Sequence, residues 1–364
     1  MVDLHELQRD ADSGPFDARL VRRLQSVHDD PVKLALPYTT LPAPVTLRST
    51  TMASRHAPID YVAIVLCTLA WGTTWYAITL QLGVVDPVVS VAYRFTLAST
   101  LLFIWCVIRG EPVRLTRAQH LAALGVGFFA IAVDYPLTYW AEERVASAVV
   151  AVIFAALAFF NLITFRLAFR QRAPRAAWGA ACLGIAGVAL LSWSEIVGAQ
   201  MNTRALIGLT MALGAVICAA GANVFAHRGE EAGASVASLM AWAMGYGAAL
   251  LVLFVFASGR TWAFEANPRY VLSLFYLAVV GSVVAFVLYF GLARRRGYTT
   301  ASYILALTPL IAMAMSTFFE GKRWRLSGLL GVALVLLGQW LLLRTQSADH
   351  KREKVGDGAG ALTD

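Results

Sequence analysis

Ten apolar stretches, separated by short polar segments, run along the chain between residues 60 and 344. Each has about 20 residues, the length that an α-helix needs to cross the hydrocarbon core of a membrane. Strands of membrane β-barrels would instead alternate apolar and polar positions over about 10 residues. The pattern therefore predicts an all-α, polytopic membrane protein with ten transmembrane helices. Their expected ranges are 60–81, 87–108, 118–140, 145–165, 176–194, 205–226, 234–257, 271–293, 298–319 and 326–344.

Lysine and arginine residues near the ends of these stretches predict how the chain is oriented. The connections are short, so consecutive helices are expected to run in opposite directions. With the N-terminus inside, 17 Lys and Arg residues between Arg48 and Lys354 fall on the inner side and 7 on the outer side. Short loops with an excess of Lys and Arg stay in the cytoplasm. We therefore expect a multi-pass protein of the cell membrane with both termini in the cytoplasm, although the outer loop 322–325 is basic.

The composition agrees with this class and excludes others. Hydrophobic residues make up 59% of the chain and charged residues 14%, with a mean hydropathy of +0.64, whereas soluble domains carry about 25% charged residues. The net charge of +8 is divided among short loops, unlike the continuous basic surface of a nucleic-acid-binding protein. The four cysteines lie singly in different apolar stretches, and the histidines show no metal-ligand spacing. No cofactor, metal ion or nucleic-acid partner is expected.

The two ends of the chain are polar. Residues 1–58 lack the apolar core of a signal peptide, and we predict that they form a disordered cytoplasmic tail, as do residues 345–364. Met52 lies just before the first apolar stretch. Two hypotheses stay open: translation begins at Met52 and residues 1–51 are an artefact of start-site choice, or the tail is genuine. Mass spectrometry of the natural N-terminus distinguishes them.

Weak internal similarity divides the ten stretches into two sets of five. Asp134–Ala148 (DYPLTYWAEERVASA) is similar to Ala285–Thr299 (AFVLYFGLARRRGYT) in its aromatic positions, and Gly187 corresponds to Gly338. Because five is an odd number, the two sets would cross the membrane in opposite orientations. Inverted repeats of this kind place a substrate site at their interface, with alternating access by rocking of one repeat against the other.

Three segments resemble a known family: LAWGTTWYAI, DPVVSVAYRFTLAS and YTTASYILALTPLIAMAMSTFFEGKRW. Their Trp71-Gly72 pair, Pro87-to-Arg94 spacing, Thr308-Pro309 and Glu320 are similar to the EamA family of the drug/metabolite transporter superfamily. The resemblance implies a ten-helix transporter made of two inverted five-helix repeats, here residues 59–194 and 205–344. One departure stands out, because the fourth stretch reads ALAFF at 156–160, without a proline. We therefore expect it to be straighter than the ninth.

Arg94 and Asp134 are the sharpest candidates for function. Each lies six or seven residues from the outer end of its predicted helix, so the two are expected at similar depth. An arginine at membrane depth costs about 3 to more than 10 kcal/mol, and a carboxylate that accepts its hydrogen bonds lowers that cost. We predict either an ion pair or the two ends of a polar substrate-binding patch; the alternative is that Arg94 extends to the outer headgroups. Protonation of Asp134 is a hypothesis for coupling to a proton gradient.

Aromatic residues at a similar level predict the wall of a cavity suited to small amphipathic solutes. They are Trp75, Tyr93, Tyr135, Trp242 and Tyr246, of which the last two are spaced i,i+4 and share a helix face. Gly72, Pro136 and Pro309 are candidate hinges or kinks, since proline frees the carbonyl four residues back. Gly- and Ala-rich runs at 179–187 and 328–338 predict close helix packing.

These features favour a secondary transporter that exports small organic metabolites, amino acids or drug-like compounds across the cytoplasmic membrane, with proton coupling as a hypothesis. A nucleotide-sugar or phosphate-ester antiporter would need several intramembrane Lys or Arg residues, and here Arg94 stands alone. A scaffold or receptor that transports nothing is the remaining alternative. Motifs of membrane-embedded enzymes, such as HExxH or GxSxG, are absent, so we do not expect an enzyme.

Overall fold

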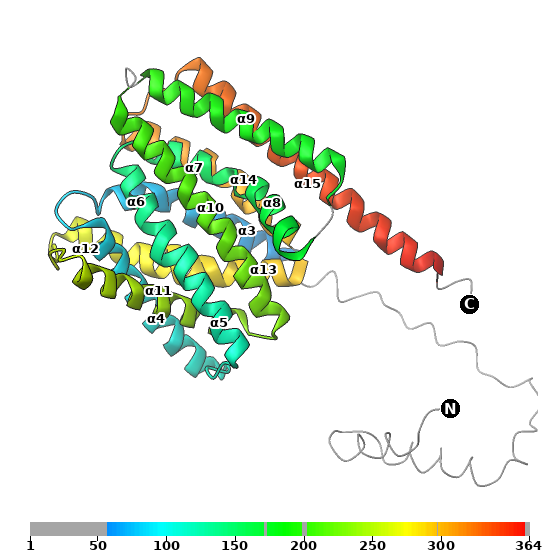
Figure 1. Ribbon diagram of the computed structural model, residues 1–364, viewed down its shortest axis with the longest axis horizontal. Helices are drawn as coiled ribbons and strands as arrows, with labels where there is room; N and C mark the ends of the chain where they lie inside the picture. Colours follow the sequence, from blue (N-terminus) through cyan, green and yellow to red (C-terminus); the bar gives the residue numbers. More distant parts are fainter. Residues whose placement is uncertain (1–56, 171–172, 199–201, 297, 361–364) are drawn as a thin grey trace, which may run out of the picture. The chain divides into compact units, whose positions relative to one another are not determined.

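The computed structural model describes residues 57–170, 173–198, 202–296 and 298–360, and all regular secondary structure in these ranges is helical (Figure 1). Residues 1–56 of the predicted N-terminal tail, including Met52, lie outside the described residues. The helices are α3 Ala57–Thr79, α4 Pro87–Arg109, α5 Arg117–Val126, η2 Gly127–Asp134, α6 Tyr135–Glu142, α7 Ser147–Ala155, α8 Leu157–Phe169, α9 Arg175–Gly198, α10 Thr203–Glu231, α11 Val236–Ala257, α12 Pro268–Ala278, η3 Val279–Val284, α13 Ala285–Arg296, α14 Tyr298–Phe319 and α15 Leu326–Gly360.

Local signals set the helix ends. The Asp86 side chain accepts a hydrogen bond from the Val88 amide at 2.8 Å and caps α4, and Pro87 occupies its first turn. At the other end of α4, Gly110 adopts φ = 67°, a left-handed conformation that favours glycine. The polar connections on either side of α4 therefore set its two ends, close to the predicted range 87–108.

Seven helical spans in the described ranges are long and apolar enough to cross a membrane: Asp60–Thr79, Pro87–Arg109, Arg117–Glu142, Arg175–Ser194, Thr203–Glu231, Val236–Ala257 and Pro268–Leu292. The pair α7 and α8 forms an eighth if it is counted as one bent span. The described apolar parts of α14 and α15, Leu307–Phe319 and Leu326–Leu342, are shorter. The all-helical, multi-span class is confirmed, and the count of ten stays a prediction.

The outer surface of these helices is apolar. At most half of each long apolar segment is buried inside the protein, and large side chains such as Val65, Ile108, Leu121 and Phe256 are exposed. Apolar patches of this extent are rare on soluble monomers. This surface is suited to contact with lipid tails.

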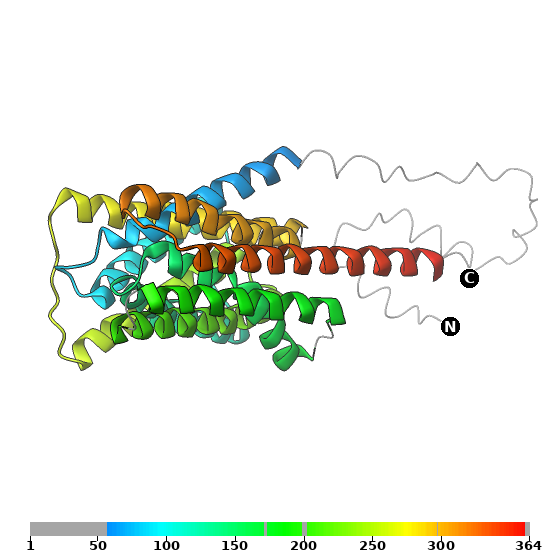
Figure 2. The same cartoon turned by 90° about the horizontal axis from the view of Figure 1, so that it is seen from above.

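Helices from the two halves of the chain pack in matched pairs (Figures 1 and 2). α4 lies along α11, and α9 lies along α15; α3 packs on α14 and α13, while α10 packs on α8 and η2. A Cβ atom on Gly187 of α9 would lie 2.6 Å from the carbonyl oxygen of Gly331 of α15. The predicted close packing of the two glycine-rich runs is therefore confirmed, since no larger side chain fits between these backbones.

The prediction that the fourth span is straighter than the ninth is wrong, because α7 and α8 meet at an angle of 40° at Ala156, whereas α14 is a single helix. No proline causes this break. The Gln339 side chain of α15 donates a hydrogen bond to the Ala155 carbonyl, and the Phe159 ring packs where a side chain at Gly184 would stand. The break is therefore stabilised by α9 and α15, not by its own sequence.

The C-terminal tail also differs from the prediction. Residues 345–360 continue α15 as a helix to Gly360, although we predicted a disordered tail from residue 345. No proline occurs between Leu326 and Gly360, and a helix that is already formed gains one backbone hydrogen bond for each added residue. The polar composition indicated solvent exposure, which is compatible with a helix.

Candidate functional site

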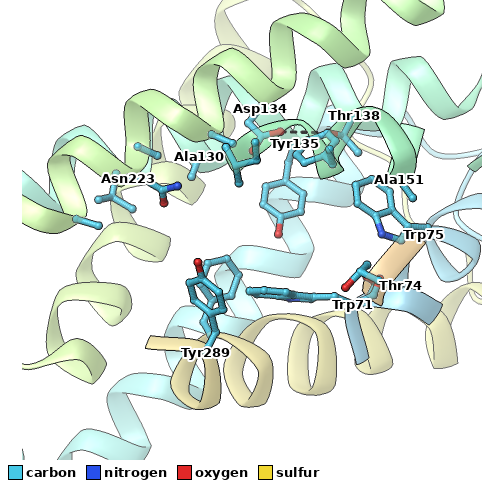
Figure 3. A pocket seen from close by; sticks show the side chains of 18 of the residues that line it. Trp71, Thr74, Trp75, Ala130, Asp134, Tyr135, Thr138, Ala151, Asn223 and Tyr289 are labelled. Carbon is cyan, nitrogen blue, oxygen red and sulfur yellow. Dashed lines mark hydrogen bonds between the residues drawn. The ribbon is translucent and has the colours of Figure 1, made fainter. Parts of the chain in front are cut away.

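A cavity of about 160 Å³ lies between the two halves of the helical body, and Figure 3 shows it from close by. Its wall is mostly aliphatic and aromatic, with a few polar side chains. The lining residues are Trp71, Thr74, Trp75, Ile78, Arg94, Val126, Ala130, Asp134, Tyr135, Thr138, Ala151, Phe154, Ala155, Leu157, Ala219, Ala222, Asn223, Ala226, Met240, Phe286, Tyr289, Phe290 and Thr308. Apolar walls with few convergent polar groups are typical of small-molecule sites.

Arg94 is the most buried large side chain of this cavity, with 1% of its surface exposed. Its Nε donates a hydrogen bond to the Ser282 Oγ at 3.1 Å, and its Cζ lies 4.6 Å from the centre of the Tyr135 ring. Its Nη1 has no hydrogen-bond partner among the residues that the structure describes. A buried donor without a partner is costly, so this nitrogen marks a place for an acceptor that the chain does not itself supply.

Asp134 lies in the same cavity but is not bound to Arg94. Its Oδ1 accepts a hydrogen bond from the Thr138 hydroxyl at 3.1 Å (Figure 3). No ion pair within 4 Å joins Arg94 and Asp134 in the described part of the chain. The structure therefore does not have the predicted ion pair, and the two charged groups line one mostly apolar cavity at separate points; their role as two ends of a substrate-binding patch stays a prediction.

Two π-helices shape this cavity. η2 ends at Asp134, and η3 carries both Gly281, whose carbonyl accepts a hydrogen bond from the Trp71 indole at 3.2 Å, and Ser282. A Cβ atom on Gly281 would lie 2.5 Å from the Thr74 Cγ2, so only glycine allows η3 to approach α3 this closely. π-Helical segments leave backbone groups free and are frequent at functional sites. Here η3 positions Ser282, which accepts the hydrogen bond from Arg94.

Comparison with known proteins decides the family. Residues 59–193 and 206–344 each match the EamA-like transporter family. The chain belongs to this family. It is 26% identical to the inner membrane transporter YedA of Escherichia coli (strain K12), over 75% of this chain and 89% of YedA. It is 24% identical to the protein PagO of Salmonella typhimurium, over 78% of this chain and 92% of PagO.

A crystal structure with 16% sequence identity shares the fold of this EamA-like transporter. The two superpose with a TM-score of 0.58, over 78% of this chain and 97% of the other. The family membership and the apolar helices together establish a multi-pass membrane protein of a transporter family. A small-molecule substrate and a lipid environment follow from that class.

The structure brings only some of the predicted aromatic residues together. Trp75 and Tyr135 line the cavity with Asp134 (Figure 3), and Arg94 lines it as well. Tyr93 does not line it: its hydroxyl donates to the Ala263 carbonyl at 3.2 Å, in the connection between α11 and α12.

Trp242 and Tyr246 also lie outside the cavity lining. The Trp242 indole donates to the Val113 carbonyl at 2.8 Å, and the Tyr246 hydroxyl lies 2.9 Å from the His120 Nδ1. They share a face of α11, as their spacing predicts, but this face packs on α5 and on the connection that precedes it. Their role in binding a solute stays a prediction that no contact in the cavity supports.

The three candidate hinge residues are all buried within helix contacts. A Cβ atom on Gly72 would lie 2.4 Å from the Ile311 Cβ, so the glycine allows α3 to pack closely on α14. Pro136 lies in the first turn of α6, directly after η2, and Pro309 lies inside α14. Because η3 is π-helical without a proline, a proline is not required for the π-helix of the second half.

Several cavity residues were not predicted. Trp71, Tyr289 and Thr308 line the cavity, and Ser282 binds Arg94 from η3. Asn223 donates to the Asn161 Oδ1 at 3.0 Å and joins α10 to α8. A serine inside the apolar run VVGSVV was the one available signal for Ser282, since a hydroxyl in such a run needs a partner.

Proposed function

We propose that the chain is a secondary transporter that exports small amphipathic solutes, with zwitterionic amino acids as the favoured class. The observation that carries this proposal is the buried Arg94 in the cavity, whose Nη1 has no partner among the described residues. A solute carboxylate would form a charge-assisted hydrogen bond there, and Asp134 would attract an ammonium group. The Trp75 indole N–H also lacks a partner in the described structure and offers a further donor.

The size of the cavity supports a small solute. On a scale where one water needs about 10–15 Å³, a volume of about 160 Å³ corresponds to roughly 11–16 waters, or to a similar number of non-hydrogen atoms. An amino acid with a side chain of modest size fits this limit. A nucleotide sugar does not fit without a rearrangement of the wall.

Alternating access between two inverted five-helix repeats is the mechanism we propose. Two observations support it: the family matches two separate segments, and the helix pairs of the halves are matched, with a π-helix in the third span of each. We place both termini in the cytoplasm and count ten spans. In this orientation, Ala226, Met240 and Phe290 extend the cavity towards the cytoplasmic end, where an exporter takes up its solute.

Coupling to the proton gradient through Asp134 is part of the proposal. Solute flux against pH in Asp134→Asn tests it: we expect the pH dependence of the wild type to weaken. Unchanged pH dependence would remove Asp134 from coupling.

The phosphate-ester antiporter is less well supported. Among the described residues that line the cavity, Arg94 is the one basic residue, and a dianionic phosphate is held better by several cations. No particular contact among the described residues favours a scaffold or receptor that does not transport a solute.

Reconstitution of the full-length chain in proteoliposomes tests the function. We expect counterflow of labelled amino acids, and a loss of about 10–100-fold in apparent affinity for Arg94→Ala, since a hydrogen bond to a charged group contributes about 1.5–3 kcal/mol. Arg109→Ala is the matched control, because Arg109 is an exposed arginine at the end of the same helix. Absence of flux for every amino acid would refute the proposed substrate class.

A further inference from the structure

A second group of buried carboxylates lies at the other end of the helices from the cytoplasmic opening proposed above. Glu142 is the last residue of α6 and is 7% exposed, and neither of its carboxylate oxygens has a hydrogen-bond partner among the described residues. Glu320 follows α14, and the two carboxyl groups interact electrostatically. Glu142 belongs to the first family segment and Glu320 to the second.

Glu320, unlike Glu142, accepts a hydrogen bond at each of its two carboxylate oxygens. Its Oε1 accepts a hydrogen bond from the Ser147 hydroxyl, and its Oε2 accepts one from the Ser316 hydroxyl at 2.5 Å. Both serines are buried, and Ser147 begins α7, which packs on α14. Because an ionised carboxylate only accepts hydrogen bonds, this arrangement suits the charged form of Glu320.

Glu142 has the opposite surroundings. An ionised Glu142 would be a buried charge without a donor, next to the like charge of Glu320, and such an arrangement is expensive. A single proton on Glu142 removes the repulsion and lets this end of the helices stay packed. Because neither oxygen of Glu142 has a hydrogen-bond partner among the described residues, the surroundings favour a carboxyl group that binds a proton.

The other groups around Glu142 connect it to the solute cavity. The Arg94 guanidinium interacts electrostatically with both Glu142 and the Tyr139 hydroxyl. Tyr139 lies one turn before Glu142, and its hydroxyl donates to the Gln81 Oε1 at 2.7 Å. The Gln81 Nε2 has no partner in the described structure, so the connection that follows α3 contributes a further polar side chain beside Tyr139.

The charged residues that follow Glu142 in the sequence interact with other groups. Glu143 pairs with Arg144 at 3.0 Å, with about a third of each side chain exposed. Arg204 of α10 donates to the Glu143 carbonyl at 2.6 Å. Within the described ranges, Arg94 and Glu320 are thus the charged groups that act most directly on Glu142.

We propose that Glu142, with Glu320 beside it, is a proton-binding site that controls opening of this end of the transporter. The inference rests on the proposed transport function and deepens it, because it adds a second proton-binding group, distinct from Asp134 and located between the two halves. When this end opens, the Glu142 O–H bond breaks and the proton passes to water; when it closes, the same bond forms again. A protonated Glu142 holds the closed end, which in the proposed orientation faces the outside of the cell.

Hydrogen exchange of the full-length chain in lipid nanodiscs tests this inference without added solute. The readout is exchange of the backbone amides in 143–150 and 316–322, corrected for the intrinsic effect of pH. We expect faster exchange as the pH rises from about 6 to about 8, by up to about tenfold per pH unit for one proton. Glu142→Gln, which is neutral at every pH, should stay slow and lose the dependence, whereas Glu143→Gln should behave as the wild type.

Three outcomes would overturn the inference. The first is an unchanged pH dependence in Glu142→Gln. The second is a midpoint that does not move in Glu320→Gln, a variant that also serves if Glu142→Gln does not fold. The third is suppression of exchange by Na⁺ at constant pH, which would make the ligand a metal cation.

Solute flux in the same preparations separates this inference from the proposed function. Flux together with exchange that does not depend on pH contradicts the proton site alone. Exchange that follows the pH, without flux of any solute, contradicts the transport function alone.

Discussion

Gly281→Ala is expected to disturb the site from a position that contacts no solute. An added Cβ would lie 2.5 Å from the Thr74 Cγ2, whereas carbon atoms pack at about 3.5–4.0 Å. η3 must therefore move away from α3 by about 1 Å, and overpacking of this kind costs about 1–3 kcal/mol. The same movement carries Ser282 away from the Arg94 Nε, so solute binding should weaken as well.

Thr74→Ser is the matched second change. It removes the Cγ2 atom but keeps the hydroxyl, which donates to the Trp71 carbonyl at 2.9 Å. The double variant should therefore recover most of the stability that Gly281→Ala loses. Two contacting residues of this kind typically show an interaction free energy of about 0.5–3 kcal/mol in a double-mutant cycle.

Stability of the four proteins of the cycle is measured by unfolding in detergent, and solute binding by equilibrium titration. If Gly281→Ala and Thr74→Ser lower stability additively, the steric reasoning is refuted. If stability recovers and solute binding does not, the link from η3 through Ser282 to Arg94 is refuted instead.

Three further changes test the packing of the helices. Gln339→Leu leaves the Ala155 carbonyl at the break of the fourth span without its partner and should cost about 1–3 kcal/mol in detergent unfolding; an unchanged stability would mean that the hydrogen bond does not support the break. Gly187→Val should separate α9 from α15, because even a Cβ atom meets the α15 backbone at 2.6 Å; cross-linking between the two helices should fall, and retention of wild-type cross-linking would contradict the close contact. Asp86→Asn removes the partly exposed ion pair with Arg260 at 2.5 Å. Thermal unfolding should therefore show a loss of stability below about 1 kcal/mol, and this loss should become smaller as salt is added. A larger loss of stability that salt leaves unchanged would contradict this expectation.

The sequence predicts the helices well because the signals are local. An apolar stretch of membrane length, with Asp86 before it and Gly110 after it, contains what is needed to begin and end α4. The break at Ala156 has no such signal. The hydrogen bond that stabilises it joins Gln339 to the Ala155 carbonyl, 184 residues apart, so no local pattern at ALAFF could reveal it.

The site was predicted in part for a similar reason. Helix length and direction gave the depth of Arg94 and Asp134, and both line the cavity. The spacing of Trp242 and Tyr246 showed that they share a face but not which neighbour this face meets. Ser282 escaped prediction because its bond to Arg94 joins residues 188 positions apart.

Two buried donors of the cavity, the Arg94 Nη1 and the Trp75 Nε1, have a practical consequence for identifying the solute. The Arg94 Nη1 and the Trp75 Nε1 have no acceptor among the described residues. A ligand that supplies these acceptors therefore gains free energy on binding, and only the folded chain offers this arrangement. By linkage, a ligand at 100 times its dissociation constant raises the stability of the folded protein by about 2.7 kcal/mol. A library of metabolites can thus be ranked by the melting temperature of the purified protein, before any transport assay exists, and the carboxylates in it should rank above their amides.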